Sequence, residues 1–414
     1  MKKYKKTDVG HAARFLQNEL NAILHSFVNG GFSYKGFALY PLVKDVSKEN
    51  ITKIKKLKET AVFLENNGYD FSNSLSKYEK YGAYDMNKMK RINSKNFALI
   101  LSSLYGDFSL IKNDDAIAMK KPKCEEFDIS DYEKNDLKYL KPLNDLKDYA
   151  NKNLKQYLLG FYIHGSFATK DYIKGFSDVD TLSVISCKTI DNPDALLELR
   201  KKIYFMRYFF YQMDPLQHHG SIIISEYDLK NYCQAYFPVQ IFKYVKSFFK
   251  EDAIQEFRVR DFSSESLEEL FWFVNYFRKL STEKKFNLGS YETKTLLHSV
   301  TLFPTIYLAA KGILVYKKFS FDIAKKDFSR QEWKAIETVS SIRSCWKELK
   351  VIPMTRLSSK LNPLLQYQLN SRIVDLFADA KKINRIDVKS IVNDMHRLSE
   401  SAWSKVNQNA KRKK

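Results

Sequence analysis

Residues that break regular structure are scarce in this sequence of 414 residues. It contains 13 glycines and 9 prolines, about 5% of the chain, where average usage would give roughly 12%. This scarcity predicts a helix-rich fold and excludes collagen-like, proline-rich and low-complexity chains. The proportions of hydrophobic residues (44%) and charged residues (28%) are typical of a globular protein rather than a disordered one.

Cysteines and long apolar runs are also few. The four cysteines lie far apart, with no CxxC pair, at Cys124, Cys187, Cys233 and Cys345. This spacing argues against a disulfide framework or a structural zinc and favours a cytoplasmic protein. The basic start lacks the apolar stretch of a signal peptide. Residues 295–310 form the most membrane-like stretch, but they are fewer than the roughly 20 apolar residues that cross a bilayer. We therefore expect no membrane span.

Acidic residues are outnumbered by basic ones. The chain has 69 lysines and arginines against 48 aspartates and glutamates, a formal net charge of +21. Such a charge favours an anionic partner, such as a nucleic acid, a nucleotide or a lipid surface. The lysines are scattered, and the only short clusters lie at residues 2–6 and 411–414. We interpret these two clusters as solvated chain ends rather than binding sites.

Helical patterns begin near the N-terminus. Residues 9–28 carry apolar side chains at spacings of three and four before Gly30, and a second stripe of this kind ends before Gly68. These patterns predict two amphipathic helices, each followed by a glycine stop. Residues 69–135 give no clear pattern. A helical packing extension is a better interpretation than a DNA-binding module, because no recognition-helix signature is present.

The middle of the chain alternates between helical and strand patterns. A helical stripe, two apolar strands, a helix opened by a capping asparagine and a proline, and a third strand follow one another, in this order: 143–154, 157–165, 178–186, Asn192-Pro193 and 218–225. This order predicts a small α/β core.

After residue 250 we find helical patterns only. Ser266-x-x-Glu269 and Ser329-x-x-Glu332 resemble capping boxes, and a further helix is expected over about 291–311 despite Pro304. No strand pattern is visible after about residue 240. We therefore expect a mostly helical N-terminal extension, an α/β core and a C-terminal helical bundle, with these bounds: 1–135, 136–250 and 251–414.

One stretch carries recognisable chemistry. Gly165 and Ser166 end the first apolar strand, and after eleven intervening residues Asp178-Val179-Asp180 begins the next. Alternate residues of a strand point to the same face, so the two aspartates should converge. Paired carboxylates suit a hard divalent cation such as Mg²⁺ or Mn²⁺. A small-residue turn with exposed N–H groups suits a phosphate.

These residues resemble the motif of the nucleotidyltransferase superfamily, which includes DNA polymerase β, poly(A) and CCA-adding polymerases and aminoglycoside nucleotidyltransferases. That motif is an apolar strand, Gly-Ser, a spacer of about ten residues, and Asp-x-Asp opening the next strand. This chain reads FYIHGSFATKDYIKGFSDVDTLSVIS. The resemblance covers roughly residues 140–230 and is fainter in the helical part that follows. It implies an α+β fold with a small mixed sheet.

The resemblance also implies an activity. Asp178 and Asp180 would bind two metal ions, Mg²⁺ or Mn²⁺, and Gly165 and Ser166 would contact the phosphates of a nucleoside triphosphate. A nucleoside monophosphate would pass to a hydroxyl acceptor, and pyrophosphate would leave. The acceptor could be a small molecule, an RNA 3′ end or a protein hydroxyl. The net charge favours RNA, whereas the helical bundle favours a small molecule.

The chain departs from the family pattern at the third carboxylate. The family usually has this acid on the strand after the intervening helix, but residues 218–225 contain none. Acids flank that strand, and His219 lies near the expected place, where it could act as a metal ligand or a general base. Packing at the strand edge is an equally good interpretation of His218 and His219. The flanking acids are Asp214, Glu226 and Asp228. The missing acid keeps open a second function, a nucleotide- or RNA-binding protein without catalysis.

The helical region adds one more candidate. Residues 294–320 loosely resemble the bundle of aminoglycoside-type nucleotidyltransferases, in which a lysine after a glycine-containing turn approaches the triphosphate. The matching residues are Lys317 and Lys318, with Lys294 as a weaker match. We assign Lys318 to the nucleotide site. For each of these lysines, a solvated surface position is the alternative.

Overall fold

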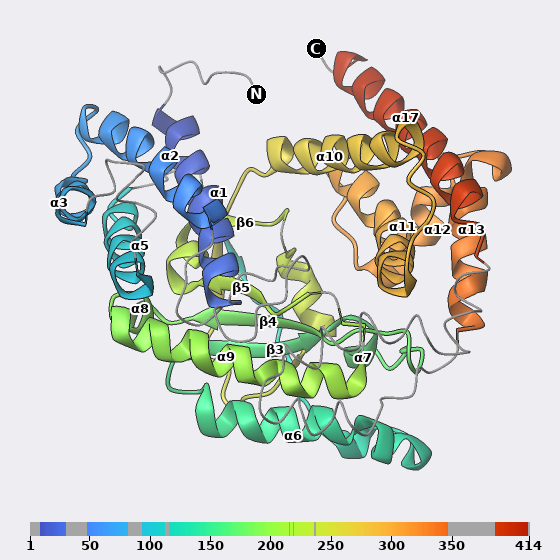
Figure 1. Ribbon diagram of the computed structural model, residues 1–414, viewed down its shortest axis with the longest axis horizontal. Coiled ribbons are helices and arrows are strands. Elements are labelled where there is room, and N and C mark those ends of the chain that lie inside the picture. Colours follow the sequence, from blue (N-terminus) through green and yellow to red (C-terminus); the bar gives the residue numbers. More distant parts are fainter. Residues whose placement is uncertain are drawn as a thin grey trace.

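The structure is a computed structural model that describes residues 9–29, 48–81, 93–111, 116–346 (apart from 215, 218 and 236) and 386–412. The fold is mixed α+β: helices surround two small sheets near the middle of the molecule (Figure 1). Among these residues, no helix is long and apolar enough to cross a membrane.

The N-terminal helices form because their apolar stripes have a common buried side. In α1 the residues spaced by three and four, such as Leu16, Leu20 and Phe27, are almost completely buried. Both helices expected from the sequence are confirmed, and within residues 48–81 and 93–111 the structure describes two more. The four are α1 (Val9–Val28), α2 (Lys48–Glu65), α3 (Ser72–Lys80) and α5 (Ser94–Phe108).

The main sheet has five strands in the order β2-β7-β3-β4-β5. Their bounds are β2 (Glu125–Glu126), β7 (Lys246–Ser247), β3 (Leu158–His164), β4 (Asp180–Ile185) and β5 (Ile222–Ser225). Strand β3 is antiparallel to β4 and to β7, and β4 is parallel to β5. The three strands expected from the sequence exist, but β5 begins only at Ile222, so His219 lies in the loop before it.

One face of this sheet is covered by two helices, α6 (Leu137–Asn153) and α9 (Pro193–Met213) (Figure 1). Helix α9 begins where the sequence predicts, because the Asn192 side chain accepts hydrogen bonds from the backbone N–H groups of the first turn. Helix α1 packs against α9 and β5. The N-terminal helices therefore have a common hydrophobic core with the sheet.

The other face of the main sheet packs against the chain that follows β5. Apolar side chains such as Tyr162, Leu182 and Val184 contact this segment, which contains two short 3₁₀-helices and part of a second sheet. The second sheet has the order β1 (Ile117–Lys120), β8 (Glu256–Arg260) and β6 (Tyr232–Cys233). The expectation of no strand after about residue 240 is therefore wrong. Strands β7 and β8 are short and pair with distant residues, so they have no local pattern.

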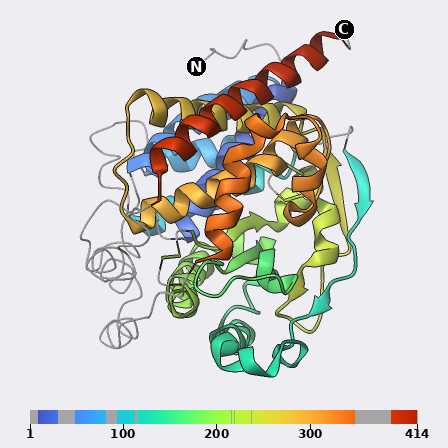
Figure 2. The same ribbon diagram turned by 90° about the vertical axis from the view of Figure 1, so that its right-hand side faces the viewer.

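The C-terminal helices have a core of their own. In residues 263–346 and 386–412 the structure describes α10 (Ser263–Thr282), α11 (Ser290–Ala310), α12 (Lys317–Lys325), α13 (Arg330–Ser344) and α17 (Val388–Arg412). Helix α17 lies across α10 and α13 (Figure 2). The capping box at Ser329 and Glu332 is confirmed. The one expected at Ser266 is wrong, because α10 begins one turn earlier and Ser266 is buried inside it.

Candidate functional site

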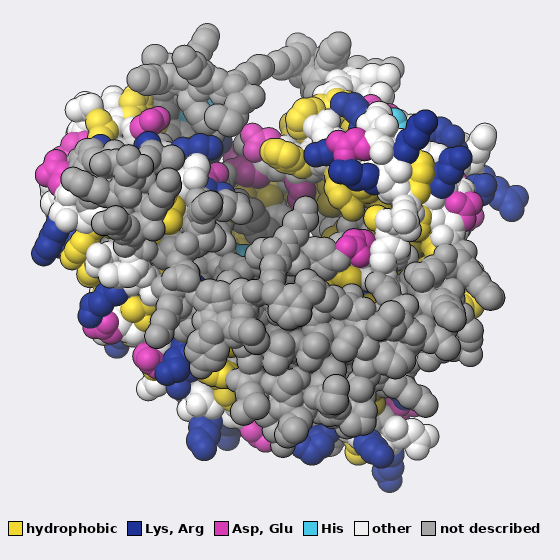
Figure 3. All heavy atoms as spheres, in the orientation of Figure 1, with side chains coloured by type: hydrophobic (Ala, Val, Ile, Leu, Met, Phe, Trp, Pro, Cys, Tyr) yellow, Lys and Arg dark blue, Asp and Glu magenta, His cyan; other side chains and the backbone are white. Residues whose placement is uncertain are grey.

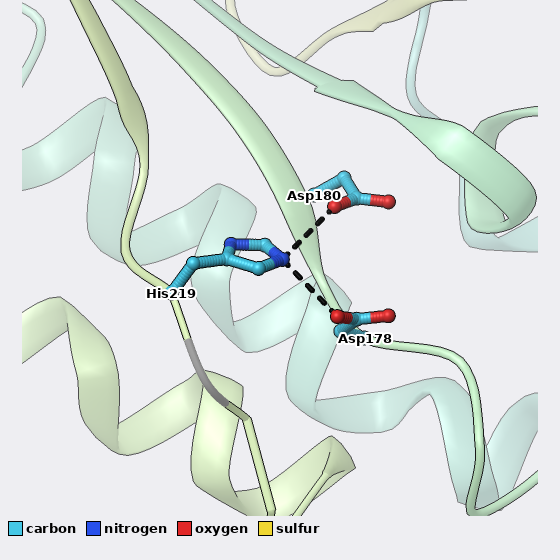
Figure 4. A group of neighbouring side chains, drawn as sticks. All are labelled: Asp178, Asp180 and His219. Carbon is cyan, nitrogen blue, oxygen red and sulfur yellow. Dashed lines mark hydrogen bonds and ion pairs between the residues drawn. The ribbon is translucent and has the colours of Figure 1, made fainter. Parts of the chain in front are cut away.

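The two motif aspartates meet a histidine at the edge of the main sheet. Asp180 is the first residue of β4, and Asp178 lies two residues before it. The Nε2 atom of His219 is 3.1 Å from Asp178 Oδ2 and 3.2 Å from Asp180 Oδ1 (Figure 4). The Asp178 side chain is buried, at 7% exposed, whereas Asp180 and His219 are about one-third exposed. Solvent therefore reaches the cluster from one side.

Gly165 brings the small-residue turn against this cluster. His164, the last residue of β3, pairs with Asp180, and the chain then turns into the short helix α7 (Gly165–Ala168). Gly165 has φ of +69°, and a Cβ there would lie 2.2 Å from Asp180 Oδ2. Only glycine allows this approach. Ser166 follows in the first turn and is half-buried, so the residues that the resemblance assigns to phosphates and to metal are neighbours.

The loop that carries His219 is fixed by the buried side chain of Gln217. Its amide oxygen accepts the backbone N–H of Val179 at 2.9 Å, and its amide nitrogen donates to the carbonyls of Val179 (3.2 Å) and His219 (3.1 Å). The Gln217 side chain thus forms the two backbone hydrogen bonds of Val179, between the two aspartates, that a neighbouring strand would otherwise form. The Nδ1 atom of His219 is 3.0 Å from the carbonyl oxygen of Gly220, which turns Nε2 toward the acids.

Charge and burial oppose each other at His219. Burial alone would lower the pKa of His219, but its hydrogen bonds to Asp178 and Asp180, together with their charges, raise it well above its ordinary value. A second histidine contacts one of these carboxylates, that of Asp178. His298 Nδ1, from α11, lies 3.4 Å from Asp178 Oδ1. Asp178 therefore faces one imidazole with each oxygen.

The loop before Asp178 is anchored in the C-terminal helices. The buried ring of Phe176 belongs to their core and stacks on the His298 ring, with centroids 4.6 Å apart. Trp346 meets Phe176 edge-on, and the Arg343 guanidinium lies over it at 4.9 Å. This packing fixes where the loop delivers Asp178 to the sheet.

A buried ion pair includes Asp214, whose carboxyl interacts electrostatically with Asp178. Lys294 Nζ, from α11, is 2.6 Å from Asp214 Oδ2 at the end of α9, and the side chains are 1% and 0% exposed. Burial raises the pKa of the Asp214 carboxyl to about 6, although the ammonium of Lys294 opposes this change. The pair joins the sheet-bearing core to the C-terminal helices. Lys294 and Asp214, both candidates from the sequence, thus contact each other.

Basic side chains from α12 and α13 lie near the acids. Lys317 is half-buried, and burial together with the charge of Arg343 lowers its pKa to about 8, against the effect of Asp178 and Asp180. Lys318 is exposed, and its Nζ lies 3.7 Å from Asp171 Oδ2. Of these two sequence candidates, it is therefore Lys317 whose charge interacts with the aspartate pair. The assignment of Lys318 to the nucleotide stays a prediction.

The remaining flanking acids lie elsewhere. Glu226 accepts the backbone N–H of Cys187 at 2.8 Å, and Asp228 caps a 3₁₀-helix through Ser225. Both follow Ser225, which pairs with Ile185 at the end of β4 opposite Asp180. His218 lies outside the described residues. No sequence pattern marks Gln217 or Phe176, because their roles depend on contacts between distant segments.

The chemistry of this cluster fits a metal ion. Asp178, Asp180 and His219 each offer one ligand atom, and these atoms lie within 4.8 Å of one another. The missing Cβ at Gly165 leaves room for the Asp180 carboxylate in this arrangement. On the face shown in Figure 3, the molecule is hollowed between the N-terminal helices and α10.

Comparison of the chain with protein-family models, with curated proteins and with solved structures finds no match.

Proposed function

We propose that this protein is a metal-dependent nucleotidyltransferase, which moves a nucleoside monophosphate from a nucleoside triphosphate to a hydroxyl acceptor. One observation carries the proposal. Asp178 and Asp180 converge at the start of β4, and the turn at Gly165 lies directly against Asp180. An anion-binding turn beside a pair of metal-binding carboxylates is the arrangement that metal-assisted phosphoryl chemistry uses.

The roles follow from position. Asp178 and Asp180 would hold Mg²⁺ or Mn²⁺, and when bound, such an ion polarises the α-phosphate and lowers the pKa of a bound hydroxyl. Gly165 and Ser166 would face the phosphates. In the reaction the acceptor oxygen bonds to the α-phosphorus while the bond from that phosphorus to the bridging oxygen breaks. Pyrophosphate leaves, and the proton of the hydroxyl passes to a nearby base or to water.

The basic side chains beside the acids support a triphosphate ligand. Lys317 at the start of α12 and Arg343 near the end of α13 interact electrostatically with Asp178. A triphosphate is strongly anionic and is bound by such cations. These residues come from the C-terminal helices, whereas the metal-binding aspartates come from the sheet. The nucleotide would therefore lie between the two.

A second candidate function rests on β5. Its four residues, Ile222–Ser225, carry no carboxylate, and the position beside the aspartate pair is taken by His219. A protein with this arrangement that binds nucleotide or RNA without transferring it is the alternative. It predicts metal-dependent nucleotide binding with no product.

Label transfer distinguishes the two functions. The purified protein is incubated with each α-³²P nucleoside triphosphate, a divalent ion, and total RNA, cell protein or a metabolite extract. We expect label in one of the three fractions, which would also identify the acceptor class. The label should disappear in Asp178→Asn/Asp180→Asn and persist in Asp145→Asn, a control at an exposed helical acid. Nucleotide binding without label in any fraction would instead favour the second function.

A further inference from the structure

The cluster at the aspartate pair contains a nitrogen donor. His219 Nε2 lies 3.1 and 3.2 Å from one oxygen of each aspartate. In a coordination sphere with ligand distances of about 2.1–2.2 Å and right angles between ligands, neighbouring ligand atoms are about 3.0–3.1 Å apart. The imidazole nitrogen is therefore placed, relative to both carboxylates, as an adjacent ligand of one ion.

The surroundings of the imidazole hold it in this orientation. Its Nδ1 faces the Gly220 carbonyl at 3.0 Å, so that Nε2 is the nitrogen presented to the acids. Gln217 holds the His219 backbone to Val179, the residue between the two aspartates. A ligand histidine whose other ring nitrogen is hydrogen-bonded to a backbone carbonyl is the usual arrangement in metal sites.

The donor set decides which ions bind best. Mg²⁺ is hard, is bound through oxygen and keeps several waters, whereas imidazole suits first-row transition ions. We propose that His219 is a metal ligand and that the site prefers a divalent transition ion over Mg²⁺. This inference rests on the proposed function for the use of the site. In this proposal, the imidazole nitrogen of His219 takes the place of the third carboxylate of the family that the motif resembles. This change of donor atom changes the class of metal ion that the site prefers.

His219 and His298 play different parts in this proposal. His298 Nδ1 faces the other oxygen of Asp178 at 3.4 Å, and its ring is stacked on Phe176. It therefore orients Asp178 so that Oδ2 faces His219. We assign His298 a positioning role.

Metal titration without nucleotide tests the proposal. Co²⁺ serves as the probe, because a bound Co²⁺ ion absorbs visible light, and Mg²⁺ and Zn²⁺ serve as competitors. The protein is first stripped with a chelator. Only absorbance that is lost in Asp178→Asn/Asp180→Asn is assigned to the site. We expect Zn²⁺ to displace Co²⁺ at similar concentrations and Mg²⁺ to need an excess of about 100-fold.

The variant His219→Asp converts the donors to three carboxylates. We expect its Co²⁺ affinity to fall at least about tenfold while its Mg²⁺ affinity is kept or rises. His11→Asp is the matched control, since His11 is exposed in the first turn of α1 and away from the cluster. Circular dichroism checks that each variant folds, and His219→Asn is measured as a second, uncharged replacement.

Three results would overturn the proposal: displacement of Co²⁺ by an equal concentration of Mg²⁺, an unchanged preference in both His219 variants, or absorbance that persists in the double aspartate variant. Because the titration contains no nucleotide, its failure is separate from a failure of label transfer. A protein that transfers label best with Mg²⁺ keeps the proposed function and contradicts this inference. A protein that binds Co²⁺ selectively but transfers no label keeps the inference and contradicts the function.

Discussion

Replacing Lys294 by methionine should lower the free energy of unfolding much more than replacing an exposed lysine. Its Nζ is 2.6 Å from Asp214 Oδ2, and both side chains are almost completely buried. Methionine keeps most of the volume but leaves the Asp214 carboxylate buried without its cation. Breaking one partner of a buried ion pair costs about 3–5 kcal/mol. We therefore expect the free energy of unfolding to fall by about this amount.

Replacing Asp214 by asparagine in the Lys294→Met variant should restore most of the lost stability. Asp214 Oδ1 also accepts the Leu216 N–H at 3.0 Å, and asparagine keeps an oxygen for this bond. Lys294→Met/Asp214→Asn removes both charges, so no buried ion is left unpaired. We expect the double variant to be more stable than Lys294→Met by about 2 kcal/mol or more, a coupling typical of groups in direct contact.

The effect should also depend on pH. The pKa of Asp214 is raised to about 6 in the folded protein, above its value in the unfolded chain. Its favourable contribution is therefore present in acid and is lost as pH rises through about 6. In Lys294→Met this loss is larger, because the ammonium no longer favours the carboxylate. The deficit of the variant relative to the natural protein should shrink between pH 8 and pH 5.

Urea unfolding followed by far-ultraviolet circular dichroism measures these changes. The control is Lys141→Met, since Lys141 forms an exposed pair with Asp145 at 2.6 Å and should cost less than about 1 kcal/mol. A loss below about 1 kcal/mol in Lys294→Met at pH 8 would show that the Asp214 carboxylate does not depend on Lys294 for its stability in the folded protein. So would a double variant as unstable as the sum of its two single variants.

Three further changes test the site and its support. Gly165→Ala places a Cβ 2.2 Å from Asp180 Oδ2 at a φ of +69°, so we expect a lower affinity for divalent ions and a loss of stability of about 1–2 kcal/mol. Gly312→Ala is the control: its φ is +80° but its Cβ would meet open space, so we expect the loss of stability alone. Nucleotide affinity should decline from pH 7 to 9 as Lys317 (pKa about 8) loses its charge, and stay level in Lys317→Arg; parallel profiles in a fluorescent-nucleotide titration would count against this role. Gly220→Ala should destabilise by about 1–3 kcal/mol, because its Cβ would lie 2.1 Å from Asn29 Oδ1, and should cost much less in Asn29→Ala; additive losses in urea unfolding would show that this contact is not tight.

Local patterns were sufficient for the elements that carry the motif. The apolar run of β3, the alternation in β4 and the Asn192-Pro193 opening of α9 each depend on neighbouring residues, and the structure contains all three. The convergence of Asp178 and Asp180 also follows from local spacing, because alternate residues of an extended chain share a face.

Long-range contacts account for what the sequence left undetermined. Strand β7 has two residues and pairs with both β2 and β3, so no periodicity marks it. The joining of α1 to the sheet depends on contacts such as Asn29 Nδ2 to the Ser221 carbonyl, at 2.9 Å, between residues about 190 positions apart. No sequence pattern predicts the role of Gln217 either, since that role depends on Val179 lying beside it.

Crystals of the chelator-treated protein soaked in Mn²⁺ would show whether Asp178, Asp180 and His219 bind one ion, because anomalous scattering locates the ion without reference to activity. We expect an anomalous peak at direct coordination distance from the Oδ2 atom of Asp178, the Oδ1 atom of Asp180 and the Nε2 atom of His219. A data set in which Mn²⁺ binds elsewhere, or in which this cluster stays without a peak at saturating Mn²⁺, would contradict this expectation.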